Sequence, residues 1–144
     1  MADVLGDPLD LPRWWPSVYL SAVEVRPAAP DRTGRRVDLH TRGWLPYTLR
    51  WQLEVVRSDY PRGFAISASG DFDGSGVWTF EQRSDAVDVT FDWRISAEKP
   101  LLRYLSFLFK PLFSANHRWA MRQGEVSLQR ELDRRRRSPK PPAA

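Results

Sequence analysis

The sequence predicts one α+β domain in which a curved antiparallel sheet of about six strands wraps a long C-terminal helix. Three observations indicate this class. The middle of the chain alternates apolar and polar residues with a period of two, and the period becomes helical after Glu98. The chain has 144 residues, of which 42% are hydrophobic, which is enough for one core. Strands followed by a helix are typical of a sheet with a helix packed on one face.

Six segments carry the alternation that gives a strand one dry face and one wet face. They are residues 19–26, 36–41, 47–55, 64–68, 78–80 and 87–95, and Asp71–Gly76 is expected to form a hairpin turn. In the last strand, Val87, Val89, Phe91, Trp93 and Ile95 are expected to be buried against the helix, with Asp88, Asp92 and Arg94 exposed. The pattern therefore predicts an antiparallel meander with one solvated face.

The helix is expected to begin at Pro100, and Pro111 either begins a second helical segment or kinks a single one. Its apolar stripe consists of Phe113, His117, Ala120, Met121, Gly124, Leu128 and Leu132. Before the sheet, one glycine and three prolines between residues 6 and 16 leave room for only short helical turns. The paired tryptophans Trp14 and Trp15 are expected to fill space between this segment and the core.

Positive charge is concentrated at the C-terminal end. Of 22 Lys and Arg residues, five belong to Arg134–Arg137 and Lys140, and the remaining 17 stand against 18 Asp and Glu. We therefore expect a single domain over 1–137 that is near-neutral apart from the arginine run and has no basic face for nucleic acid. The arginine run is expected to form a solvated helix end, and residues 138–144 a disordered tail.

Several classes of protein are disfavoured by composition. Cysteine is absent, so disulfides and thiolate metal sites are excluded. The first ten residues hold three aspartates and no basic residue, unlike a secretory signal. No run approaches the roughly 20 apolar residues that span a bilayer. His40, expected in solvent, and His117 are too differently placed for a metal site. These observations predict a cytoplasmic protein without stable membrane insertion, metal or cofactor.

Two motifs indicate a family. One is Pro111–His117, followed by Trp119, Met121, Gly124 and Leu128, and the other is Leu11–Val18 with its Trp-Trp-Pro sequence. They resemble the last helix, and the junction before the second strand, of polyketide cyclase/dehydrase-like proteins in the START-like (SRPBCC) superfamily. The similarity covers residues 11–132. It implies a helix-grip fold with a hydrophobic cavity between the concave sheet face and the C-terminal helix.

The front of the chain departs from this family, whose members usually start with a strand and a fuller helical pair. Ten residues precede Leu11. Either the true start lies upstream or the chain lacks an edge strand. The second case would leave unpaired backbone groups on the neighbouring strand.

The resemblance implies a cavity lined by large side chains from the dry strand faces and the helix. The candidate ligand-binding residues are Tyr47, Trp51, Trp78, Phe80, Phe91, Trp93, Phe113, His117 and Met121. Taken singly, each is better explained as part of an ordinary core, because aromatic residues dominate many cores. Their number in so small a sheet favours a lined pocket.

Catalytic residues are not identified by the sequence, and the candidates are His117 and Tyr47. His117 lies on the apolar stripe, where it could move a proton, and a buried imidazole held by Asn116 or a backbone carbonyl is the competing interpretation. Glu81 and Asp92 are expected to point outward, which leaves no carboxylate pair for acid/base work.

Three functions are consistent with these observations. The first is binding of a lipid or polyketide-like molecule in a carrier or sequestering role. The second is a cyclase or dehydratase in which His117 or Tyr47 moves a proton. The third is a protein-interaction module that uses a sheet edge or the arginine tail and has no pocket. The sequence does not determine the ligand or the oligomeric state.

Overall fold

The computed structural model describes residues 1–43, 48–96 and 100–138, without the side chains of residues 96, 100–110 and 113. Three short helical segments come first: α1 (Ala2–Leu5), the 3-10 segment η1 (Pro8–Asp10) and α2 (Leu11–Trp14). Six strands follow: β1 (Tyr19–Arg26), β2 (Arg36–Arg42), β3 (Thr48–Asp59), β4 (Gly63–Gly70), β5 (Asp73–Gln82) and β6 (Val87–Ser96). The chain then forms α3 (Pro100–Arg137). This order confirms the predicted α+β class.

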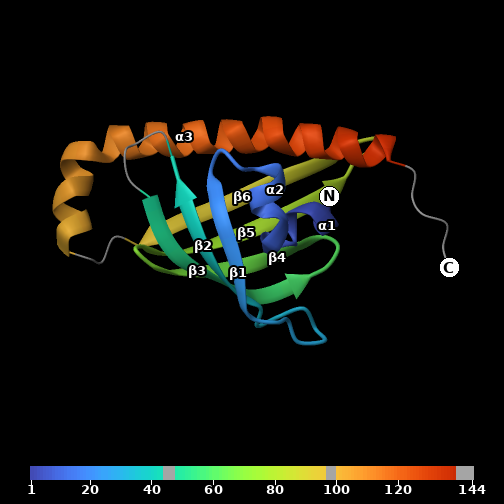
Figure 1. The fold of residues 1–144 in the computed structure, drawn as a ribbon, viewed down its shortest axis with the longest axis horizontal. Coiled ribbons are helices and arrows are strands. Elements are labelled where there is room, and N and C mark those ends of the chain that lie inside the picture. Colours follow the sequence, from blue (N-terminus) through green and yellow to red (C-terminus); the bar gives the residue numbers. More distant parts are fainter. Residues whose placement is uncertain (44–47, 97–99, 139–144) are drawn as a thin grey trace.

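The strands form one open antiparallel sheet in the order β1-β2-β3-β4-β5-β6, so the predicted meander is confirmed. Figure 1 shows α3 lying across one side of the sheet, with α1 and α2 beneath its C-terminal half. In the described part of the chain, β1 and β6 are the two edges of the sheet.

The two-residue alternation sorts side chains between an inner and an outer sheet face. On the inner face, Val37 lies opposite Leu53 and Leu39 opposite Trp51, and all four side chains are buried. On the outer face, Asp38 lies opposite Gln52 and their side chains are hydrogen-bonded at 2.9 Å. Because side chains alternate strictly along a strand, a slip of one residue would reverse both faces.

Strand β6 has the predicted phase but less burial than predicted. Asp88, Asp92 and Arg94 are exposed, as expected. On the inner face, however, Val87, Phe91 and Trp93 are half-buried, while Val89 and Ile95 keep 36% and 57% of their surface exposed. The expectation of a fully buried face was wrong because β6 is an edge strand that the described part of α3 covers incompletely.

The predicted turn over Asp71–Gly76 is shorter than expected. Strand β4 ends at Gly70 and β5 begins at Asp73, so Gly74 and Gly76 belong to the strand. A Cβ atom on Gly76 would come within 2.7 Å of the Phe91 ring and 2.8 Å of the Trp93 ring. Glycine is therefore needed here for the close approach of two rings, and its presence resembles a turn signal in the sequence.

Helix α3 is continuous and contains Pro111, and Figure 1 shows that it bends in its N-terminal part. Proline removes a backbone donor and favours such a bend. The later part packs through Ala120, Met121, Leu128 and Leu132 on a core formed by α1, α2 and Phe80. Among the described residues, no helix combines the length and apolarity needed to cross a bilayer.

The paired tryptophans connect this helix to the N-terminal segment, as predicted. Trp14 and Trp15 are buried and their rings stack at 5.6 Å between centroids. Gly124 of α3 is buried directly against the Trp15 ring, and a Cβ at position 124 would overlap that ring. The small residue allows the helix to approach α2 closely.

Candidate functional site

The inner face of the sheet carries a continuous series of rings, which we call the aromatic row: Trp51, Phe72, Trp93, Phe91 and Trp78. Trp78 and Phe91 stack with centroids 4.0 Å apart and an angle of 15° between their planes. Phe91 stacks on Trp93 at 5.5 Å, and Phe72 joins Trp93 at 6.0 Å and Trp51 at 5.2 Å. Each ring thus contacts the next, across strands β3, β5 and β6 and the β4–β5 turn.

Strand register explains how the sequence builds the row. Trp78 lies opposite Phe91, and Trp93 lies opposite Gly76, so the rings stand on adjacent strands of the same face. Cross-strand neighbours on one face lie about 4.5–5.5 Å apart at Cβ, which places aromatic side chains in contact. Gly76 lets the Trp93 and Phe91 rings approach the backbone of β5 closely.

Burial decreases along the row from the centre of the sheet toward β6. Trp51 is 8% exposed, and its Nε1 donates a hydrogen bond of 3.1 Å to Oγ1 of buried Thr41. Phe72, Trp78, Phe91 and Trp93 are only half-buried. Four large rings therefore pack against one another while keeping part of their apolar surface open.

A pocket of about 250 Å³ adjoins the Trp78 end of the row. Phe64 and Phe80 line it, and both rings contact Trp78, at centroid distances of 6.3 and 6.4 Å. The rest of the lining comes from α1 and the two residues after it, the β1–β2 loop, strand β3, the β3–β4 turn and the first residue of β4. The pocket thus lies at the end of the aromatic row, and no described side chain of α3 lines it.

The rim of this pocket is charged but balanced. The Tyr60 hydroxyl donates a hydrogen bond of 2.8 Å to Asp3, which raises the pKa of Tyr60, and the Arg32 guanidinium lies 3.7 Å from the centroid of the Tyr60 ring. Arg35 is ion-paired at 3.3 Å with Asp7. The pocket therefore combines an apolar floor with a polar rim of both charges.

The structure brings together four of the predicted ligand-binding residues, namely Trp51, Trp78, Phe91 and Trp93. Phe80 is buried and lines the adjoining pocket, and Met121 packs on the core next to α1 and α2. Tyr47 and the side chain of Phe113 lie outside the described residues. Sequence reasoning did not include Phe72 among the candidates, because it falls in the segment interpreted only as a turn. It also did not include Phe64, although Phe64 belongs to the alternating pattern of its strand.

Neither histidine lies where it was expected. His117 is exposed on α3, unlike the buried imidazole considered above, and partial desolvation lowers its pKa. No hydrogen bond of its ring is found in the part of the chain that the structure describes. His40, expected in solvent, is half-buried on the outer face with its Nε2 shielded from water.

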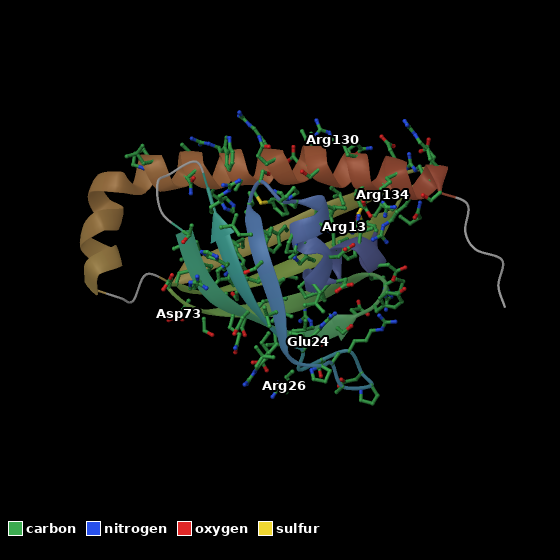
Figure 2. The ribbon with its side chains drawn as sticks, viewed as in Figure 1. Arg13, Glu24, Arg26, Asp73, Arg130 and Arg134 are labelled. Carbon is green, nitrogen blue, oxygen red and sulfur yellow. The ribbon has the colours of Figure 1, made fainter. Side chains whose placement is uncertain are left out.

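An ionic cluster holds the end of α3 to the N-terminal segment. Glu131 is 4% exposed and accepts two hydrogen bonds from Arg13, of 3.0 and 2.7 Å, and two of 2.9 Å from Arg134. Arg135 donates another at 2.7 Å, and Asp10 binds both Arg13 and Arg135. Figure 2 shows Arg13 and Arg134 in the space between the two segments, whereas Arg130 points away.

These contacts indicate that Glu131 has a structural role, which is to hold the end of α3 to the N-terminal segment. Hydrogen bonds from Arg134 and Arg13 hold the pKa of its carboxyl far below its usual value. A carboxylate held so firmly in its ionised form is a poor proton donor. The predicted solvated helix end is thus only part of the picture: Arg134–Arg137 are all exposed, but two of them bind a buried carboxylate.

The described part of the chain contains no group of three or more His, Asp or Glu side chains arranged to hold a metal ion. Glu81 and Asp92 are exposed on the outer face, as predicted. Comparison with protein-family models, curated proteins and solved structures found no match for this chain. Function is therefore inferred from the geometry of the aromatic row and its adjoining pocket.

Proposed function

We propose that the chain is a START-like, helix-grip binding protein that holds an apolar small molecule, lipid or polyketide-like, against the aromatic row in a carrier or sequestering role. One observation carries the proposal: the rings of Phe72, Trp78, Phe91 and Trp93 form a chain of contacts and remain half-buried on the inner face of the sheet. Contiguous apolar surface of this kind is typical of binding sites.

The free energy gained by burying apolar ring surface favours a ligand that covers several rings at once. Burial of apolar surface contributes about 25 cal/mol per Å². A flat molecule that removes roughly 200 Å² of ring surface from water would gain about 5 kcal/mol by that measure, before the cost of association. A ligand small enough to cover a single ring would gain too little to bind well.

The adjoining pocket adds a polar requirement. Its floor of Phe64 and Phe80 continues from Trp78, while its rim carries Arg32 and Asp3. A ligand lying on the row with one end at this pocket could place a polar group among donors and acceptors of both charges. The proposed ligand is therefore an amphiphile with an apolar body and a polar end.

The enzyme alternative lacks a comparable observation. His117 is exposed, and within the described residues no side chain orients its ring as a general base would require. Replacing His117 by Gln keeps hydrogen-bonding capacity and removes proton transfer. A carrier retains its ligand affinity in this variant, whereas a cyclase that uses His117 loses turnover while affinity persists.

The test is titration with the neutral fluorescent probe N-phenylnaphthylamine. Wild type is expected to bind it, and Phe91→Leu and Trp93→Leu to weaken binding by about tenfold or more, since stacking partners are lost. Trp119→Leu is the matched control, because Trp119 packs on the α1–α2 core and, among the described residues, makes no ring contact with the row. Unfolding of each variant is followed in parallel. Equal probe affinity in all four folded proteins would contradict the proposal.

A further inference from the structure

Strand β6 offers a long backbone edge. It is the last strand in the sheet order, and its ten residues pair with β5 in an unbroken register from Gln82–Val87 to Asp73–Ser96. In an antiparallel strand, alternate residues direct their backbone N–H and C=O groups to opposite edges. Half of the backbone groups of β6 therefore point away from β5.

The other edge of the sheet is less suited to pairing. Strand β1 has two register irregularities, between Tyr19 and Ser21 and between Glu24 and Arg26. Bulges of this kind twist a strand and are a common protection against edge association. In contrast, the register of β6 is regular, and Val89 and Ile95 remain 36% and 57% exposed beside its edge.

The sequence of β6 is complementary to itself about Phe91. When two copies run antiparallel with Phe91 opposite Phe91, Val89 faces Trp93 and Val87 faces Ile95 on the inner side. On the outer side Asp88 faces Arg94, whose side chains are 59% and 79% exposed. Apolar residues thus meet apolar residues, and opposite charges meet twice because of the two-fold symmetry.

Neighbouring registers that keep both inner faces on the same side fit less well. Centring on Asp92 places that carboxylate opposite its own copy, and centring on Thr90 places Asp88 opposite Asp92. Like charges directly opposite are destabilising. Centring on Trp93 leaves Val87 and Val89 without partners among the residues of β6. The register about Phe91 is the one that pairs the whole of residues 87–95.

We propose that two copies of this chain associate through the β6 edges in this register, joining their sheets into one that continues across the two-fold axis. The occupant of the edge is a second copy because the charge pattern of β6 complements itself. Within one copy, Arg83 forms an ion pair with Asp88 at 2.7 Å, and Arg94 forms one with Asp92 at 3.3 Å. These exposed pairs are weak and can exchange for the pairs between copies.

A charge-swap cycle tests the interface, with mass measured by light scattering across a range of concentrations. Wild type is expected to be a dimer, and Asp88→Arg and Arg94→Asp to weaken it at least tenfold. The double variant, which restores opposite charges across the axis, is expected to recover dimerisation. A purely intramolecular role of these residues would not give this recovery. A monomeric wild type, or a dimer unaffected by the single variants, would overturn the proposal.

Cysteine crosslinking tests the register on the same full chain, which has no cysteine of its own. Phe91→Cys places a thiol opposite its copy, at the Cα separation of a cross-strand pair, which permits a disulfide. Under oxidation a crosslinked dimer is expected for Phe91→Cys and not for the matched variant Val89→Cys, which faces Trp93. Equal crosslinking of both folded variants, or of neither, would refute this register.

Discussion

Replacing Glu131 by Gln tests how α3 is held to the rest of the chain. The substitution keeps the size of the side chain but removes the charge that Arg13, Arg134 and Arg135 share. It also points an amide donor toward guanidinium groups. Asp10 then remains as the described carboxylate of the cluster.

The magnitude follows from burial. Removing one partner of a buried ion pair costs about 3–5 kcal/mol. The cost is lower here because the side chains of Arg13, Arg134 and Arg135 are 45%, 55% and 38% exposed, so water can solvate the charges that are released. We expect a loss of about 2 kcal/mol in the free energy of unfolding, or roughly 4–8 °C in Tm for a chain of this size.

The assay is urea and thermal unfolding followed by circular dichroism at neutral pH. Asp133→Asn is the matched control, since this carboxylate is half exposed and reaches Arg136 at 3.8 Å. An exposed pair of this kind contributes little, so Tm of the control should stay within about 2 °C of wild type. A Glu131→Gln variant as stable as the control would refute the structural role assigned to Glu131.

The same cluster predicts a pH dependence. The pKa of Glu131 is lowered in the folded chain from its usual value of 4.5, so the unfolded chain takes up this proton first as pH falls. Its contribution is therefore fully present above about pH 4.5 and is lost as pH falls toward the folded pKa. The difference in stability between wild type and Glu131→Gln should shrink over this range. A constant difference from pH 7 to pH 3 would contradict this assignment.

Three further substitutions or deletions test the packing. Gly124→Ala should gain about 1 kcal/mol of helix propensity yet lose more by overlap with the Trp15 ring, for a net loss of about 1–2 kcal/mol in urea unfolding; a gain in stability would contradict the close approach. Gly76→Ala should cost about 1–3 kcal/mol by displacing the two rings above it, while Ser75→Ala on the outer face should cost less than about 0.5 kcal/mol. Deleting Ser138–Ala144 should change Tm by less than about 1 °C, and a loss of several degrees would show that these residues make native contacts.

Much of the fold was predictable because alternation is a local signal. The two-residue alternation correctly predicted which face of the sheet carries Val37, Leu53 and Asp92. The change to a helical period correctly predicted that α3 begins at Pro100. What periodicity cannot provide is how far a helix covers each strand. The exposure of Ile95 depends on its edge position, which is a property of the whole sheet.

The site was less predictable than the fold for a related reason. Trp78, Phe91 and Trp93 could be placed on one face from alternation, but Phe72 falls in a turn, where no period exists. Glu131 could not be recognised either. Its burial depends on Arg13, which is 118 residues away in the sequence and is brought near by the packing of α2 on α3.

Native mass spectrometry of freshly purified protein tests the central proposal most directly. The account predicts, for wild type, an excess mass from a non-covalently bound apolar molecule that organic extraction removes, and a strong reduction of this excess in Phe91→Leu but not in Trp119→Leu. Wild-type protein that carries no such molecule and takes up no N-phenylnaphthylamine would contradict it.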